Sequence, residues 1–155
     1  MDHPFMARAI QLSIDNVTSR KGGPFGAVVV KNGAIVAEGV NRVTATNDPT
    51  AHAEVVAIRE ACRKLEVFEL TDCDLYTSCE PCPMCLGAIY WARLSKVYFG
   101  GLAEDANDAG FDDSSIYREF AQPHSARTIP MTQMMRGEAL AAFRAWKDTD
   151  HKIRY

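Results

Sequence analysis

The chain has 155 residues, 47% of them hydrophobic and 24% charged, and a formal net charge of −3. This composition is typical of one soluble folded domain and excludes an intrinsically disordered chain. The 17 basic residues form no cluster of the kind that marks a dedicated nucleic-acid binder. No apolar stretch reaches the roughly 20 residues of a membrane span, and the opening sequence MDHPFMARAIQ lacks a secretion signal. We therefore expect a cytoplasmic protein whose cysteines are reduced.

Apolar periodicity predicts helices that alternate with strands. Strands are expected at 25–31, 34–41, 74–78, 96–100 and 129–135, with Asn32-Gly33 as a two-residue hairpin turn between the first two. Helices are expected at about 4–19, from 50 or 51, at 84–93, 114–121 and 138–147, while 42–49 is expected to be loop. The first helix is indicated by apolar residues at helical spacing, Met6, Ile10, Ile14 and Val17. This order predicts a single domain over residues 1–155, a three-layer α/β/α sandwich with a mixed five-stranded sheet.

Three potential metal ligands stand at the starts of two predicted helices. His52 begins one, and Cys82 and Cys85 lie one helical turn apart at the start of another. The free N–H groups and the positive dipole end of a helix favour thiolates at such positions. One imidazole and two thiolates match the ligand preference of zinc and leave a fourth position for a water molecule, which zinc activates. Glu54, two residues after His52, is placed to exchange protons with that water.

The other three cysteines have structural interpretations. Cys62 falls on an apolar helix face, and Cys73 lies at a strand edge. Cys79 could complete a closed structural metal site with the three ligands, which would leave no open position. We favour packing at the end of a strand, because Pro81 turns the chain between Cys79 and Cys82.

The motifs around these ligands resemble the cytidine deaminase superfamily. His52-Ala53-Glu54 followed by Pro81-Cys82-Pro83-Met84-Cys85 is the H-x-E…P-C-x-x-C signature of zinc nucleobase deaminases. The resemblance extends to GPFGAV at 23–28, Asn41, NDPTAHAE at 47–54 and SCEPCPMCLGAIYWAR at 78–93. The segments AGFDD at 109–113 and RTIP at 127–130 are similar to those of small bacterial guanine deaminases in particular. Nearly the whole chain is covered by this resemblance.

The resemblance implies hydrolysis of guanine to xanthine and ammonia, with one zinc ion per subunit held by His52, Cys82 and Cys85. It implies that zinc-bound hydroxide attacks C2 of guanine while Glu54 shuttles the protons. Asp113 would read the guanine and relay protons to the departing amine.

The resemblance also implies how the purine is held. Asn41 would hydrogen-bond it, and the other substrate-binding residues would be Phe25, Ala53, Trp91 and Tyr155. Phe25 and Trp91 would form walls against the flat ring, and Tyr155 would belong to a lid. Relatives of this kind are homodimers, so we expect the C-terminal segment, about 137–155, to swap onto a partner subunit.

Several alternatives stay open. Asp112 and Asp113 could cap a helix that begins at Ser114, with Asp112 the better capping candidate. A tRNA adenosine deaminase shares the motif around the metal, but the acidic stretch 101–108 would repel phosphates. A guanosine deaminase or a deaminase of another amino-purine or triazine is also compatible with the motifs. A zinc-stabilised binding module without chemistry would differ in needing the metal for folding.

Overall fold

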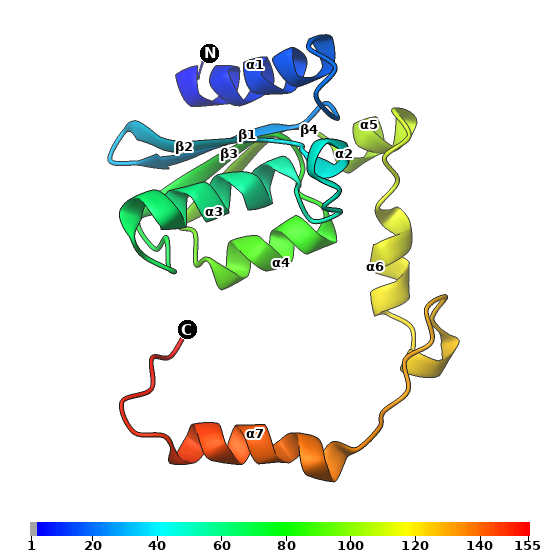
Figure 1. The fold of residues 1–155 in the computed structure, drawn as a ribbon. Helices are drawn as coiled ribbons and strands as arrows, with labels where there is room; N and C mark the ends of the chain where they lie inside the picture. The colour runs from blue at the N-terminus through cyan, green and yellow to red at the C-terminus, as the bar shows by residue number, and fades with distance from the viewer. Residues whose placement is uncertain (1–2) are drawn as a thin grey trace. The chain divides into compact units, whose positions relative to one another are not determined.

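A computed structural model describes residues 3–155 (Figure 1). The chain divides after Ser114 into two compact units, which we describe separately. The strands of the first unit are β1 (Gly26–Lys31), β2 (Ala34–Val40), β3 (Cys73–Cys79) and β4 (Lys96–Gly101). Its helices are α1 (Pro4–Thr18), α2 (Val43–Thr46), α3 (Ala53–Leu65), α4 (Pro83–Trp91) and α5 (Ala103–Asp108). The predicted α/β order is confirmed, while the short helices α2 and α5 were not expected.

The sheet of the first unit has the strand order β2-β1-β3-β4. It is mixed as predicted, because β1 is antiparallel to β2 and β3 whereas β3 and β4 are parallel. The predicted hairpin turn is confirmed, since Asn32 and Gly33 both have positive φ, 51° and 74°, as a type I′ turn requires. Figure 1 shows α1 on one face of the sheet and α3 and α4 on the other.

The prediction of a fifth strand at 129–135 is wrong. Within the described residues the sheet has four strands, and 129–135 lie in the second unit without strand structure. Pro130 has no N–H to donate to a ladder. Met135 has a φ of 50°, the left-handed conformation in which a strand cannot continue. Ile129 and Met134 are exposed, so the apolar residues that suggested a buried strand face solvent in this chain.

Helix α1 meets the sheet through its small residues. Ala9 and Ser13 are buried, whereas Ile10 and Ile14, which indicated the helix, are 41% and 49% exposed. A Cβ added to Gly26 of β1 would meet the carbonyl oxygen of Ala9 and lie 2.8 Å from the Ser13 nitrogen. Because glycine has no Cβ, the helix backbone lies directly on the strand. Met6 and Leu12 pack beside this contact, whereas Ile10 and Ile14 face outward.

Helix α3 packs on the opposite face, where a second close approach fixes its start. A Cβ added to Gly39 of β2 would meet the carbonyl oxygen of Ala53 and lie 2.6 Å from the Ala57 nitrogen. The first turn of α3 therefore rests directly on β2. The core on this side is a cluster of buried residues that includes Val29, Ala57, Ala61, Leu70, Cys73 and Leu75.

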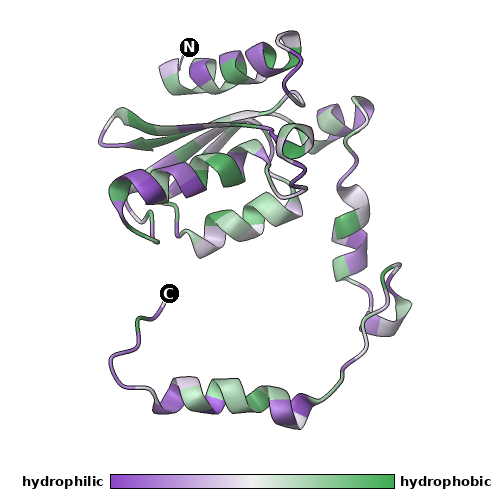
Figure 2. Ribbon diagram, viewed as in Figure 1, coloured by the Kyte–Doolittle hydropathy of each residue, from purple (hydrophilic) through white to green (hydrophobic). Residues whose placement is uncertain are grey.

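The second unit contains most of α6 (Ser114–Phe120), the 3₁₀ turn η1 (His124–Ala126) and α7 (Arg136–Asp148). Both predicted helices of this region are confirmed. The carboxylate of Glu119 accepts hydrogen bonds from the Thr128 nitrogen at 2.7 Å and the Thr128 hydroxyl at 2.8 Å, which holds the turn between the helices. Apolar residues gather in the middle of α7, where Phe143 is 64% exposed (Figure 2). Across residues 3–155, no helix combines the length and apolarity that crossing a bilayer requires.

Candidate metal centre

His52 is the residue that caps the start of α3, and its extended backbone turns the chain into the helix. The turn before it is held by Asp48, whose Oδ1 accepts hydrogen bonds from the Thr50 nitrogen at 2.8 Å and the Thr50 hydroxyl at 2.6 Å. The Arg42 nitrogen donates to the Ala51 carbonyl at 2.9 Å, which ties this turn to the end of β2. The helix thus begins at Ala53, two to three residues later than predicted.

Cys82 occupies the equivalent position at the start of α4. Pro83 follows as the first helical residue, where its missing N–H and fixed φ fit the first turn. Cys85 comes one turn later and is fully buried. The predicted placement of all three ligands at helix N-termini is confirmed, and both helix dipoles favour thiolate there.

The three side chains converge on one point. His52 Nδ1 lies 3.5 Å from Cys82 Sγ and 3.5 Å from Cys85 Sγ, and the three ligand atoms lie within 4.8 Å of one another. Nitrogen at about 2.0 Å and sulfur at about 2.3 Å from a tetrahedral zinc ion are about 3.5 Å apart. The donor types and their spacing therefore fit zinc and leave one tetrahedral position without a protein ligand.

The pKa values of the three ligand groups are shifted in different directions. A hydrogen bond from Cys85 lowers the pKa of Cys82 to about 4, which makes it a thiolate at neutral pH. The same hydrogen bond, together with burial, raises the pKa of the Cys85 thiol. Hydrogen bonding to Cys82 raises the pKa of His52. A divalent cation would compete with these protons for all three groups, because metal binding requires their deprotonated forms.

Glu54 lies beside the cluster and is 5% exposed. Its Oε2 lies 3.3 Å from Cys85 Sγ, and its Oε1 accepts a hydrogen bond from the Thr77 hydroxyl at 3.2 Å. Burial raises the pKa of this carboxyl group, which favours its protonated form. A carboxyl group with a raised pKa beside potential metal ligands suits general acid–base chemistry. Sequence reasoning missed Thr77, although a polar residue on the buried face of a strand was a usable signal.

Cys79 is not one of the clustered ligands. Its Sγ donates to the Leu102 carbonyl at 3.5 Å, and burial raises its pKa to about 11. A thiol in this state packs at the end of β3, and the geometry gives no support to a closed site of three cysteines and a histidine.

Asn41 and Phe25 come together just beyond the sheet. Asn41 follows β2 and is 8% exposed, and its backbone nitrogen donates a hydrogen bond to the Phe25 carbonyl at 3.1 Å. Phe25 packs edge-on against Phe111, with ring centroids 5.0 Å apart. A Cβ on Gly23 would lie 3.6 Å from both Asn41 Cγ and Phe111 Cζ, so these groups surround the glycine. Phe111 was not singled out from the sequence, although it lies inside the GFDD motif.

Asp113 lies near enough to the ligands to act on them electrostatically. It contributes to the raised pKa of His52, and burial followed by the charge of Cys82 raises the pKa of Asp113 itself. Asp112 has a different environment, because its Oδ1 accepts a hydrogen bond from the Ser114 nitrogen at 2.8 Å. Asp112 therefore caps the start of α6, as the sequence suggested, whereas the role of Asp113 stays a prediction.

Three other predicted substrate-binding residues are Ala53, Trp91 and Tyr155. Ala53 is fully buried, and its carbonyl oxygen faces Gly39. Trp91 ends α4 and is 69% exposed; it follows Cys85 by six residues, which corresponds to about 9 Å along the helix axis. Tyr155 belongs to the second unit and is also exposed. Their roles stay predictions.

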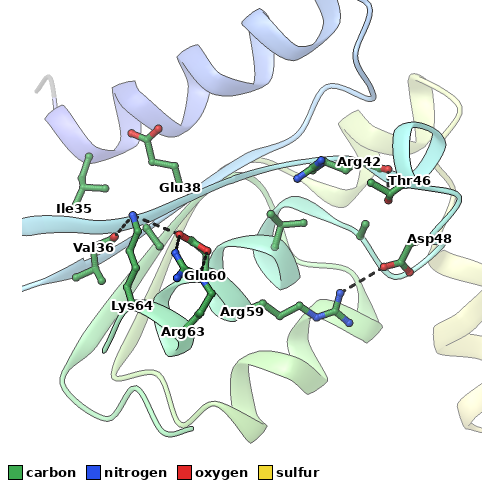
Figure 3. A pocket seen from close by; sticks show the side chains of 13 residues that line it. Ile35, Val36, Glu38, Arg42, Thr46, Asp48, Arg59, Glu60, Arg63 and Lys64 are labelled. Carbon is green, nitrogen blue, oxygen red and sulfur yellow. Dashed lines mark hydrogen bonds and ion pairs between the residues drawn. The ribbon is translucent and has the colours of Figure 1, made fainter. Parts of the chain in front are cut away.

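A separate hollow of about 820 Å³ lies between β2 and the outer side of α3. Figure 3 shows Arg59, Arg63 and Lys64 in it, each paired with an acidic side chain or a carbonyl group. Arg59 reaches Asp48 at 3.5 Å, and Lys64 donates to the Val36 carbonyl at 3.0 Å. The metal ligands do not line this hollow, so its charged groups support α3 and the Asp48 turn from outside.

Residues 1–101 match the family described as the cytidine and deoxycytidylate deaminase zinc-binding region. The match spans both helix starts that carry the ligands. The chain belongs to this deaminase family. Its membership explains why an imidazole and two thiolates meet at adjacent helix N-termini.

Individual family members show different degrees of similarity. Guanine deaminase of Bacillus subtilis (strain 168) is 56% identical over 156 residues, which cover 100% of each chain. The X-ray structure of guanine deaminase from Bacillus subtilis superimposes with a TM-score of 0.96 over 100% of this chain and 99% of that one. A guanine deaminase from Nitrosomonas europaea has 30% identity and a TM-score of 0.68 over 96% and 87% of the two chains. A tRNA-specific adenosine deaminase of Aquifex aeolicus (strain VF5) is 48% identical over 79 residues, 51% of this chain and 52% of that one.

Proposed function

We propose that the chain is a zinc-dependent guanine deaminase that converts guanine and water to xanthine and ammonia. The observation that carries this proposal is the 56% identity to the Bacillus subtilis enzyme over the full length of both chains. Similarity to the tRNA-specific relative covers about half the chain. Residues 101–108, which include the acidic helix α5, would repel the phosphates of a nucleic acid.

The chemistry follows from the positions of the side chains. His52, Cys82 and Cys85 would hold the zinc ion, and the bound ion would supply a Lewis acid to activate water for attack at C2 of guanine. Glu54 accepts a proton from the attacking water on Oε2, which faces the ligands. It then returns a proton to the amine, so that ammonia leaves and oxygen takes its place at C2.

The remaining residues bind and orient the purine. The side chain of Asn41 hydrogen-bonds the ring, and Phe25, packed on Phe111, forms an apolar wall that excludes water. Asp113 completes recognition of guanine and relays protons to the leaving amine. Its proximity to His52 and Cys82 supports this role.

We also propose a homodimer in which residues 137–155 cover the partner's site and Tyr155 forms part of the lid. Trp91 and Tyr155 are 69% and 72% exposed, and they are among several exposed aromatic side chains that a partner would bury. Mixing two slow variants would test whether residues 137–155 are exchanged between the subunits. Glu54→Gln and Tyr155→Ala homodimers should each be slow, and refolding them together should restore activity in heterodimers. Failure of the mixture to recover activity would place the lid within one chain.

The first experiment is a comparison of ammonia release from guanine, guanosine, adenine, cytidine and an unmodified tRNA by the zinc-loaded protein. Turnover of guanine far above the other four is the expected result. Turnover of tRNA or guanosine without guanine would overturn the substrate while leaving the metal chemistry intact. No turnover of any of the five, with stoichiometric zinc, would favour a structural metal site.

A further inference from the structure

Thr77 is a polar residue in the middle of the sheet. It pairs with Ala27 of β1 and Phe99 of β4 and is completely buried. Leu75, two positions earlier and hence on the same face of β3, belongs to the core under α3. A buried hydroxyl in such a place requires a hydrogen-bond partner, because leaving it unpaired costs free energy.

The partner of Thr77 is the carboxylate of Glu54. The Thr77 hydroxyl donates to Oε1 at 3.2 Å, while Oε2 lies 3.3 Å from Cys85 Sγ. The two oxygens of this carboxylate therefore have different surroundings. Oε1 is held by the sheet, and Oε2 faces the potential metal ligands.

The terminal torsion of a glutamate side chain has a broad energy minimum, so burial alone does not fix the plane of its carboxylate. A hydrogen bond from a strand residue does fix it, since Thr77 has a stiff β-branched side chain in the centre of the sheet. Proton transfer depends on such alignment, and misplacement by about 1 Å can cost on the order of 100-fold in rate.

We propose that Thr77 is a positioning residue that anchors Oε1 of Glu54 and so keeps Oε2 directed at the water that the deaminase activates. This inference rests on the proposed function, in which Glu54 carries the proton. It assigns a different role to each carboxylate oxygen, because Oε1 is anchored by Thr77 and Oε2 exchanges the proton. Thr77 itself touches neither the substrate nor the metal ligands in this scheme.

The test compares Thr77→Val, which preserves the shape without the donor, with Thr77→Ser, which keeps the donor. Loss of this buried hydrogen bond, and of the alignment that it provides, should lower kcat for guanine by about 10- to 100-fold in the valine variant. We expect KM, inhibition by xanthine and zinc content to stay within about twofold of the unmodified protein, because binding groups are untouched. The serine variant should recover kcat to within about threefold.

A matched control separates positioning from general damage to β3. Ser78→Ala removes the neighbouring hydroxyl, which accepts a hydrogen bond from the Gly26 nitrogen at 3.1 Å and does not contact Glu54. Its kcat should be unchanged. Equal losses in the Ser78→Ala and Thr77→Val variants, or a serine variant as slow as the valine variant, would overturn the proposal.

A double-mutant cycle links the effect to Glu54. In the Glu54→Gln background, Thr77→Val should reduce the residual rate by less than about twofold, because the proton carrier is already lost. Full additivity of the two losses would refute the inference. A slow Glu54→Gln variant with an unaffected Thr77→Val variant would refute the role of Thr77 alone, whereas a fully active Glu54→Gln variant would refute the proposed mechanism itself.

Discussion

The side-chain amide of Asn16 donates hydrogen bonds to the carbonyl oxygens of Asn41 at 2.9 Å and Gly23 at 2.8 Å. Asn16 lies on the buried face of α1 and is 4% exposed. One nitrogen thereby joins the end of β2 to the loop that leads into β1. These are the two segments that bring Asn41 and Phe25 together.

Replacing Asn16 by alanine should weaken both the fold and purine binding. We expect a loss of about 1–3 kcal/mol in the free energy of unfolding, because two buried carbonyl groups lose a donor. KM for guanine should rise more than kcat falls, since Asn41 is proposed to hold the ring. Urea unfolding and steady-state kinetics measure the two effects. Gln11→Ala, which removes an exposed side chain from the same helix, is the control; a kcat loss with unchanged KM would contradict the prediction.

Glu54→Gln should separate metal binding from turnover. The amide keeps the size of the side chain but cannot carry the proton, so kcat should fall by about 100- to 10,000-fold. Zinc content, measured by atomic emission, should remain one ion per chain because Glu54 is not among the clustered ligands. Retention of more than a tenth of the activity would exclude Glu54 as the main proton carrier.

Cys79 and Cys82, three positions apart in the sequence, should behave differently on substitution. Cys82→Ser should lose tight zinc binding and activity, because the low-pKa thiolate is a member of the ligand cluster. Cys79→Ser should keep both, because the Cys79 thiol is protonated and donates to Leu102. Titration with a colorimetric chelator distinguishes the two variants. Loss of zinc from Cys79→Ser would instead support a closed structural site.

The ion pair between Arg8 and Glu38 should make stability depend on pH. Two hydrogen bonds of 2.7 Å join these side chains and hold the pKa of Glu38 below its usual value. A depressed folded-state pKa gives stabilisation above the unfolded-state pKa of about 4.3, and this is lost as pH falls through the folded-state pKa. Because the side chains are 42% and 36% exposed, solvent screens the pair, and its contribution should stay below about 1 kcal/mol.

Glu38→Gln should therefore lower the free energy of unfolding slightly at pH 7, and the difference from the unmodified protein should shrink toward pH 3.5. Urea unfolding at several pH values measures this difference. High salt should reduce it at pH 7, because exposed charges are screened. A difference that grows in acid would contradict the assigned direction of the Glu38 pKa.

Local signals predicted much of the fold and the ligand set. Asn32-Gly33 specified the hairpin through its two positive φ angles, and the spacing of Cys82 and Cys85 placed both on one helical turn. The hydrogen bonds from Asn16 to Asn41 and from Thr77 to Glu54 span 25 and 23 residues, so local signals could not identify these pairs. The predicted strand at 129–135 failed for a related reason. Its apolar residues satisfied a strand pattern, but within the described residues 129–135 are not part of the sheet.

The exposure of Ile10 and Ile14 on α1 could not be predicted from the local sequence pattern either. Periodicity correctly predicted the helix but not which side would meet the sheet. The side of α1 that meets the sheet is set at Gly26, because only a residue without a Cβ lets Ala9 approach the strand so closely. A glycine on one element thus determined the orientation of another.

The ligand cluster joins two helix starts that are far apart along the chain, at His52 and Cys82. An ion bound there would hold these two helix starts together only in the folded chain, because the unfolded chain does not bring the three ligands to one point. Its free energy of binding would add to the stability of the first unit in proportion to the logarithm of the free metal concentration. The stability of the first unit would thereby depend on the supply of the same ion that the proposed reaction requires.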